Sequence, residues 1–257
     1  MENIKQISMK RTILTLLTAT FFAVLTLGAQ DNSRKQEKDT LYFKASQMPD
    51  AVVFLPAPPS DSSLLMKYDI SRYEWGKTLR DTPRGELAKL HATTKIPEMC
   101  RLFSESFGLE ISKEKTPAIY RLIKKSIKTI RLGATGPKQA YMRKRPFVVY
   151  GEKTITPKWD KDLAGTGSYP SGHSIRGWGM ALLLSEINPA AQNALLSYGF
   201  EWGESRVIGG YHWQSDVDAS RVLASACYAR LHTNADFLRD MQAAREEFQR
   251  LSAEQGK

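Results

Sequence analysis

Two histidines in the second half of the chain have neighbours that could make them chemically active. His212 lies four residues before Asp216, and residues four apart share one face of a helix. The Asp216 carboxylate would then accept a hydrogen bond from one imidazole nitrogen, which fixes the tautomer and leaves the other nitrogen as a nucleophile. The alternative is a surface His–Asp pair with no chemical role. Arg206 nearby and His173 upstream weigh against that alternative.

The second histidine stands at the predicted start of a helix. His173 follows Ser171 and Gly172, and apolar residues at helical spacing continue from there up to Pro189. The unpaired backbone N–H groups at a helix N-terminus, together with the positive end of its dipole, favour an anion. Glycine lets that anion approach the backbone closely. A plain serine N-cap followed by an incidental histidine is the alternative interpretation.

Cations accompany both histidine segments. Lys138 and Arg145 lie in a basic stretch upstream, and Arg206 precedes His212 by six residues. A phosphate monoester is a dianion near neutral pH, so attack on it requires neutralisation of its equatorial oxygens. Planar guanidinium groups suit bidentate contacts to such oxygens. Taken alone, a basic stretch of this kind is more often a solvent-facing surface.

Together, the three segments specify one reaction. His212 attacks phosphorus to give a phosphohistidine, while His173 protonates the leaving alcohol. Water then enters by the same route, with His173 acting as the base. The groups predicted to bind the phosphate are Lys138, Arg145, Arg206 and the residues at the helix start, Ser171 and Gly172.

These segments resemble the three-part signature of the phosphatidic acid phosphatase type 2 superfamily. The matching positions are Lys138 with Arg145 and Pro146; Pro170, Ser171, Gly172 and His173; and Ser205 and Arg206 with His212 and Asp216. The longer strings around both histidines are similar to the secreted bacterial class A non-specific acid phosphatases. This likeness runs from about residue 54 to residue 248 and so covers most of the chain.

The resemblance implies a fold and an activity. It implies a single compact all-α domain of the phosphatidic acid phosphatase type 2 and vanadium haloperoxidase type. It also implies a phosphomonoesterase of broad specificity that acts on small-molecule esters in mildly acidic conditions, without a metal or other cofactor, and often as a homo-oligomer. Two departures are Ser174, where a threonine is expected, and Gly209, where relatives often have a cysteine.

The elements that must hold the site are expected to be mainly helices. Isoleucines recur at spacings of four and three within a basic segment and predict a helix with one buried face; they are Ile119, Ile123, Ile127 and Ile130. A heptad-like pattern over residues 237–251 fits either core packing or a dimer seam. The best strand candidate is the short apolar run 147–150.

Composition limits the class of protein. The 257 residues include 42% hydrophobic and 25% charged side chains, which suits one globular domain. A net charge of +10 favours anionic partners, but no nucleic-acid-binding motif is present, so nucleic acid is not expected as a partner. Cys100 and Cys227 lack metal-ligand spacing, which excludes a structural zinc, and they fit either a disulfide or two buried thiols.

The N-terminus predicts export. A basic start and an apolar run over residues 13–27 predict a signal peptide over residues 1–29, with an uncleaved anchor as the alternative. Gln30 stands where a lipoprotein would need cysteine, so a mature product without an anchor is expected in the periplasm or outside the cell. A lead-in segment over residues 30–53 and a catalytic domain over residues 54–257 would follow. No later stretch is apolar enough to cross a membrane.

Two related activities compete with this hypothesis. Lipid phosphate and pyrophosphate phosphatases share the three motifs but contain several membrane spans, which this sequence lacks. Vanadium-dependent haloperoxidases hold vanadate in a similar pocket, so peroxidase chemistry is the alternative enzyme class.

Overall fold

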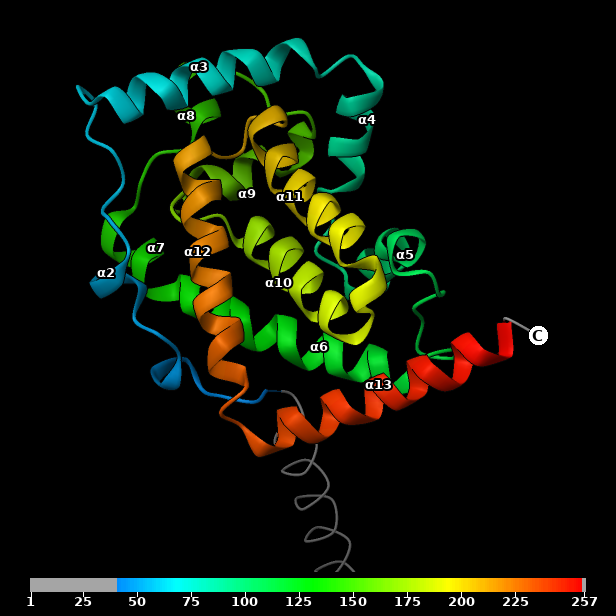
Figure 1. Ribbon diagram of the computed structural model, residues 1–257. Coiled ribbons are helices and arrows are strands. Elements are labelled where there is room, and N and C mark those ends of the chain that lie inside the picture. The colour runs from blue at the N-terminus through cyan, green and yellow to red at the C-terminus, as the bar shows by residue number, and fades with distance from the viewer. Residues whose placement is uncertain (1–40, 256–257) are drawn as a thin grey trace, which may run out of the picture. The chain divides into compact units, whose positions relative to one another are not determined.

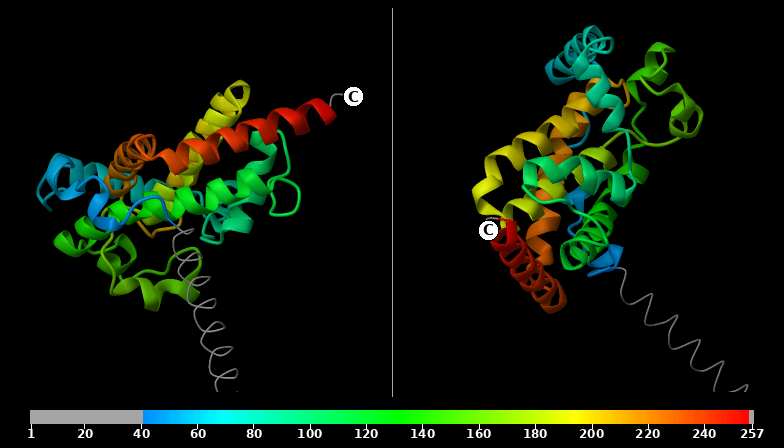
Figure 2. Two further views of the ribbon diagram at one scale, coloured as in Figure 1. Left: turned by 90° about the horizontal axis from the view of Figure 1, so that it is seen from below. Right: turned by 90° about the vertical axis from the view of Figure 1, so that its right-hand side faces the viewer.

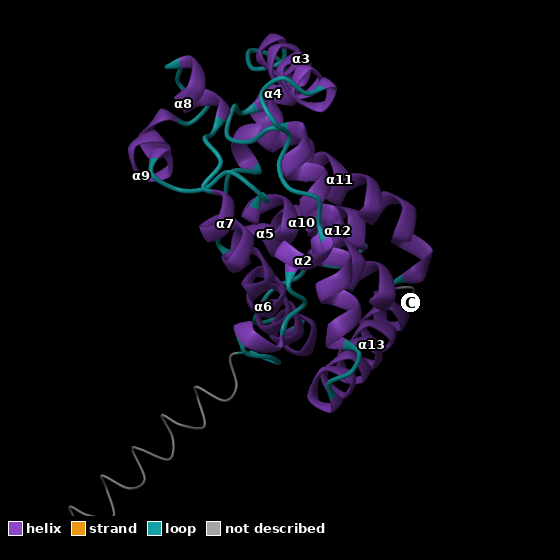
Figure 3. Cartoon of the chain, turned by 90° about the vertical axis from the view of Figure 1, so that its left-hand side faces the viewer, coloured by secondary structure: helices purple, strands orange, loops and turns teal. Residues whose placement is uncertain are grey.

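Helices form all the regular secondary structure in residues 41–255, the part of the chain that the computed structural model describes (Figure 1, Figure 3). This confirms the all-α prediction. The expected signal peptide and the start of the lead-in segment lie outside the described residues. None of the described helices is long and apolar enough to cross a membrane.

The helices follow one another with short connections. In chain order they are η1 (Ala45–Gln47), α2 (Ala51–Phe54), α3 (Leu64–Thr78), α4 (Pro83–Leu90), α5 (Ile96–Phe107), α6 (Pro117–Arg131), η2 (Leu132–Ala134), α7 (Thr135–Tyr141), α8 (Pro146–Tyr150), η3 (Pro157–Trp159), α9 (Asp160–Ala164), α10 (Gly172–Ile187), η4 (Pro189–Ala191), α11 (Gln192–Ile208), α12 (Gln214–Leu231) and α13 (Ala235–Gln255).

Helix α10 lies at the centre of the bundle, in contact with α6, α11 and α12 (Figure 1). Glycines bring α10 and α11 close together. A Cβ at Gly177 would lie 2.4 Å from Cγ of Trp202, and a Cβ at Gly199 would lie 2.4 Å from Cβ of Ala181. Glycine lowers helix propensity, so its use here serves the close approach of the two backbones. This packing fixes the start of α10 relative to the end of α11, and both ends carry predicted site residues.

Both predicted amphipathic helices form and pack on the core. The isoleucine face of α6 is buried, as predicted. On α13, Phe237, Met241 and Ala244 are buried, and the helix runs beside α6 (Figure 2). The heptad-like pattern of α13 therefore reflects core packing within one chain.

The strand prediction for residues 147–150 was wrong, because this run forms the short helix α8. Pro146 occupies the first turn of α8, where its fixed φ and missing N–H suit a helix start. A run of four apolar residues is too short for its period to separate strand from helix.

Part of the expected lead-in segment is packed against the core. Tyr42, Met48 and Ala51 are buried, and the Tyr42 hydroxyl donates a hydrogen bond of 2.6 Å to Asp240 on α13. The packed part of the chain thus begins ahead of Phe54, where the sequence placed the domain start.

The two cysteines are both free and buried. Burial raises the pKa of Cys100 and of Cys227 to about 12, so both remain thiols. Of the two possibilities for this pair, the structure has the buried thiols.

Candidate active site

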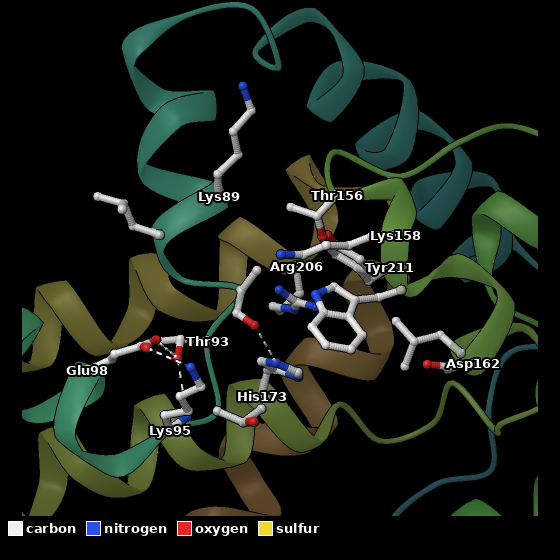
Figure 4. Close-up of a pocket in the computed structure, with 15 residues that line it drawn as sticks. Lys89, Thr93, Lys95, Glu98, Thr156, Lys158, Asp162, His173, Arg206 and Tyr211 are labelled. Atoms are coloured by element: carbon white, nitrogen blue, oxygen red, sulfur yellow. Dashed lines mark hydrogen bonds and ion pairs between the residues drawn. The ribbon is translucent and has the colours of Figure 1, made fainter.

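A cavity of about 530 Å³ opens between the end of α4 with the loop after it, the segment η3–α9, and the end of α11. Cavities of roughly 300–1,000 Å³ are usual for small-molecule sites. Figure 4 shows His173 and Arg206 in the middle of this cavity. Side chains from the α4 side and from the η3–α9 side surround them; those labelled are Lys89, Thr93 and Lys95 on the first side and Thr156, Lys158 and Asp162 on the second.

The start of α10 has the predicted geometry. Ser171 is the N-cap, and its hydroxyl accepts a hydrogen bond from the backbone N–H of Ser174 at 3.3 Å. Gly172 and His173 occupy the first turn, where backbone N–H groups have no partner within the helix. The anion-binding end of α10 therefore lies next to the cavity that His173 lines.

His173 is held by the backbone of the opposite wall. Its Nε2 lies 3.1 Å from the carbonyl oxygen of Ala92, which can only accept, so Nε2 carries a hydrogen. The transferable proton then belongs on Nδ1. Burial, followed by the charges of Arg206 and Arg176, holds the pKa of His173 well below its usual value. A bound phosphate dianion would oppose those positive charges and favour the protonated ring that an acid needs.

The loop that carries Ala92 is anchored by a third histidine. His91 is buried and stacks on Trp202 with ring centroids 4.4 Å apart. Its Nδ1 lies 2.8 Å from the Ser205 hydroxyl, and its Nε2 lies 3.0 Å from the Tyr198 hydroxyl. Burial and nearby arginines lower the pKa of His91 to about 3, so it stays neutral and serves as a fixed support.

His212 is not helical, contrary to the prediction that it shares a helix face with Asp216. Helix α11 ends at Ile208, and α12 begins only at Gln214. Between them Gly210 has φ +80°, a left-handed conformation that glycine adopts without strain. This turn interrupts the helix and directs the chain back toward Arg206, whose carbonyl accepts a hydrogen bond of 3.3 Å from the His212 backbone N–H.

The turn nevertheless brings His212 and Asp216 together. The Nδ1 of His212 lies 3.4 Å from Asp216 and 3.2 Å from the Ser168 hydroxyl. Ser168 donates its hydrogen to Asp216, so its oxygen accepts from Nδ1–H of His212. Asp216 thus acts on the imidazole largely through Ser168, a link that sequence analysis missed. Nε2 keeps its lone pair and lies 3.1 Å from Nη1 of Arg145.

Arg143 and Asp69, also missed from the sequence, hold Asp216 in place. Arg143 donates to Asp216 at 2.7 Å and to Asp69 at 2.8 Å, and both carboxylates are fully buried. Asp69 in turn accepts from the backbone N–H of Ser215 at 2.8 Å. Asp69 lies on α3, far from the motifs in the sequence, and Arg143 looked like any other cation in its basic stretch. No local pattern marks either of them.

The predicted phosphate-binding cations surround His212. Arg145 is buried and also donates to the carbonyl of Tyr211 at 3.0 Å. Lys138 donates to the carbonyl of Gly167 at 2.7 Å. Burial and the charge of Arg145 lower the pKa of Lys138 to about 7. Burial, with Arg145 and Lys138 next, also holds the pKa of His212 well below its usual value.

Arg206 has unused hydrogen-bonding capacity. It is 2% exposed, and its guanidinium lies 3.8 Å from the ring centroid of Tyr211. Its Nε and Nη1 have no hydrogen-bond partner among residues 41–255. A buried donor without a partner is costly, and this one lines the cavity, so the group is ready to receive an anion.

Two further arginines lie beside the start of α10. A Cβ built on Gly172 would lie 3.9 Å from Arg131 and 3.9 Å from Arg176. Burial, followed by the charge of Arg131, lowers the pKa of Arg176 to about 10. Both increase the positive potential of the site, although neither belongs to the predicted set.

In the described part of the chain, no three side chains of the His, Cys, Asp and Glu types form a group that could hold a metal ion.

Known proteins are similar to this sequence. The family model of the PAP2 superfamily matches residues 126–239. A non-specific acid phosphatase of Providencia stuartii is 42% identical over 236 residues, which is 91% of this chain and 94% of that protein. A non-specific acid phosphatase of Salmonella typhimurium is 37% identical over 195 residues, covering 76% of this chain and 78% of that protein. An acid phosphatase of Zymomonas mobilis is 32% identical over 226 residues, covering 88% of this chain and 84% of that protein.

Proposed function

The chain belongs to the non-specific acid phosphatases of the PAP2 superfamily and is a phosphoric monoester hydrolase, and from this premise we propose how its site works. The proposal is hydrolysis of phosphate monoesters of broad specificity through a phosphohistidine at His212. The family assignment confirms the resemblance found in the three sequence motifs.

The observation that carries the proposal is the environment of His212. Ser168 and Asp216 hold the hydrogen on Nδ1, so the lone pair is on Nε2, next to Arg145. Nε2 attacks phosphorus as the ester P–O bond breaks, and Nδ1 of His173 gives its proton to the departing oxygen. The phosphorylated ring is cationic, and the Asp216 carboxylate stabilises it through Ser168.

Hydrolysis of the intermediate reverses these roles. Water attacks phosphorus while the now neutral His173 accepts its proton, the P–N bond breaks, and Nε2 recovers its lone pair. Throughout, the phosphoryl oxygens are neutralised by positive groups; these are Lys138, Arg145, Arg206 and the backbone amide of Gly172. Arg206 supports this role best, because its donors are free for the anion. The predicted contribution of the Ser171 amide is absent, because that N–H donates to the carbonyl of Asp216 at 3.2 Å.

The same proposal includes the conditions of action. His212 must be neutral to attack, and His173 must be protonated to assist departure, so the rate should be bell-shaped in pH with an acidic optimum. All the positive groups are side chains and amides of the chain itself, which supports catalysis without a metal. We also propose that the protein acts in the periplasm or outside the cell, on the basis of the predicted signal peptide.

Rapid quenching of a labelled ester tests the intermediate. Wild type should yield an acid-labile, base-stable phosphoenzyme, whereas His212→Ala should yield none and should lose about 10⁴- to 10⁶-fold in turnover. His232→Ala is the matched control, since the ring of His232 is hydrogen-bonded to Glu186 on α10 and to the carbonyl of Tyr228 on α12, and to none of the groups around His212. A normal phosphoenzyme in His212→Ala would refute the assignment.

The haloperoxidase alternative has its own assay. Vanadate should inhibit hydrolysis, because it can adopt the five-coordinate geometry of the transition state at His212. Bromide oxidation with vanadate and peroxide, at a rate comparable to ester hydrolysis, would favour peroxidase chemistry instead. The named activities of the relatives support hydrolysis.

A further inference from the structure

The groups proposed to bind the phosphoryl group occupy only the inner part of the cavity. His173, Arg206 and Tyr211 line that part, whereas the cavity as a whole has a volume of about 530 Å³. The leaving group must therefore occupy the outer part, between the α4 side and the η3–α9 side (Figure 4). The residues of these two walls decide which alcohols fit.

The outer part presents apolar surface. Trp159 on η3 lines the cavity and is 49% exposed, and Leu90 at the end of α4 lines it and is 51% exposed. Neither side chain belongs to the hydrophobic core. Large apolar side chains exposed together at the mouth of a polar site are typical of ligand contacts.

Two of the three rim lysines are paired with carboxylates on the same helix or next to it, which argues against a site for a second phosphate. Lys89 pairs with Glu86 at 2.6 Å, and Lys95 pairs with Glu98 at 3.2 Å. Lys158 lies over the Trp159 ring, with its Nζ 5.4 Å from the ring centroid. A cation on one face of the indole leaves the other face for a ligand.

The segment that carries Trp159 is tied to the phosphate site. The backbone N–H of Thr154 donates to Asp160 at 3.1 Å, which closes the loop around η3. Thr156 is hydrogen-bonded to the Tyr211 hydroxyl, and the Tyr211 ring supports Arg206. The backbone that carries the indole is thus tied to the groups proposed to bind the phosphate, as a stacking platform requires.

We propose that Trp159 determines specificity by stacking on a planar aromatic ring of the leaving group, such as a nucleobase or a phenyl ring. This inference rests on the proposed function. Stacking of a base on an aromatic side chain is strong enough to change affinity by about tenfold.

Two substrates isolate the effect of the base. Adenosine 5′-monophosphate and ribose 5-phosphate have the same leaving oxygen and differ only in the adenine. In wild type, kcat/KM should be about tenfold higher for the nucleotide. Trp159→Ala should lose this advantage while its kcat/KM for ribose 5-phosphate stays within about twofold. Trp159→Phe should recover most of the advantage, because a phenyl ring also stacks.

The control is Trp75→Ala, which removes a tryptophan that is 40% exposed on α3 and does not line the cavity. It should keep the wild-type preference. Adenosine alone should inhibit wild type competitively and Trp159→Ala about tenfold more weakly. If wild type hydrolyses neither ester, the proposed function is refuted. If wild type hydrolyses both, and Trp159→Ala loses kcat/KM equally on the two esters or on neither, only the stacking proposal is refuted.

A second pair of esters identifies the source of the ring. 2-Phenylethyl phosphate and ethyl phosphate also share an alkyl leaving oxygen and differ in a phenyl group. A Trp159-dependent preference in both pairs would show that any aromatic ring is accepted, and a preference in the nucleotide pair alone would show that the platform is selective for a nucleobase. A preference in neither pair would overturn the proposal.

Discussion

The inner and outer ends of the cavity are built in different ways. Behind the inner end, buried charges from distant parts of the chain contact one another: Arg143, which does not itself line the cavity, joins Asp69 on α3 to Asp216 on α12. At the outer end, ion pairs such as Lys89–Glu86 lie three residues apart on one exposed helix surface. Pairs of the first kind depend on the whole fold, and pairs of the second kind need only a helix.

This difference means that the groups proposed to react and the groups proposed to contact the leaving group are held in different ways. The reacting groups are oriented by contacts that exist before any ligand arrives, which lowers the reorganisation needed for the reaction. The walls that meet the leaving group hold exposed side chains with local partners. A fixed inner end combined with a permissive outer end is what a broad-specificity hydrolase requires.

Among variants that keep the nucleophile His212, the largest effect should follow from removing the acid at the inner end. His173→Ala should lose about 10²- to 10⁴-fold on an alkyl phosphate, whose alkoxide is a poor leaving group. On a nitroaryl phosphate the variant should still form the phosphoenzyme, because the phenolate departs without a proton. The intermediate should then accumulate on His212, since the base for water is missing. Equal losses on both esters, without a trapped intermediate, would contradict the role of His173.

The buried charge network should be next in magnitude, and its effect should be on folding. Arg143→Ala leaves Asp69 and Asp216 buried without their cation, which should destabilise the protein by about 3–5 kcal/mol. Urea denaturation measures this change. Arg239→Ala on α13 breaks an exposed pair with Asp236 and should leave the midpoint almost unchanged. Similar shifts in the two variants would erase the distinction between inner and outer pairs.

The inner end should also make stability depend on pH. The pKa of His173 and that of His212 lie well below 6.5, so the unfolded chain binds more protons below that pH, and stability should fall as the pH drops through it. The pKa of Lys138, about 7 against 10.5 when unperturbed, gives a loss of the same sign as the pH falls from 10.5 to 7. Thermal unfolding of the ligand-free protein at several pH values checks both.

Phosphate should reverse this effect, because a dianion raises the pKa of the histidines around it. Calorimetry of phosphate binding near pH 6.5, in two buffers with different ionisation enthalpies, should show proton uptake. Absence of uptake, after subtraction of the protons that phosphate itself releases on binding as a dianion, would contradict this reversal.

A smaller effect is expected at the rim. Lys89→Ala should change kcat/KM by less than about threefold for any ester, because the lysine already pairs with Glu86 in an exposed setting. The measurement is a comparison of alkyl and aryl phosphates at two salt concentrations. A tenfold loss would show that the rim lysine contacts the substrate directly.

Chelation should have no effect. Exhaustive treatment with EDTA should leave turnover unchanged, since the proposed positive groups at the inner end belong to the chain. Loss of activity that zinc or magnesium restores would require a different account of charge neutralisation.

The structure brings predicted site residues together, as His212 with Asp216 and Arg145, but in a local geometry that the sequence did not predict. The order of the motif residues and the serine cap of α10 can both be recognised from residues that are neighbours in the sequence. The helical placement of His212 was wrong because α11 ends before Gly209 and Gly210, and the prediction relied on the four-residue spacing between His212 and Asp216 without weighing these glycines. Arg143 and Asp69 could not be found, because a contact between residues 74 positions apart leaves no periodicity in the sequence.

Prediction of the fold had a similar limit. Long amphipathic patterns such as that of α6 were correctly assigned, because many residues repeat the same period. The four-residue run of α8 and the packing of Tyr42 were not, since the first is too short to show a period and the second depends on tertiary contacts with Asp240.

The partner of His173 has a consequence for how this site can vary. The acceptor is the backbone carbonyl of Ala92, which every amino acid possesses, so no codon at position 92 can delete it. A mutation can alter this contact only by displacing the loop that carries Ala92. The mutable target is therefore His91, whose ring stacks on Trp202 and sets the path of the backbone. A hydrogen bond accepted by the backbone cannot be removed by substituting its own residue, but substitution of a neighbouring residue can displace it.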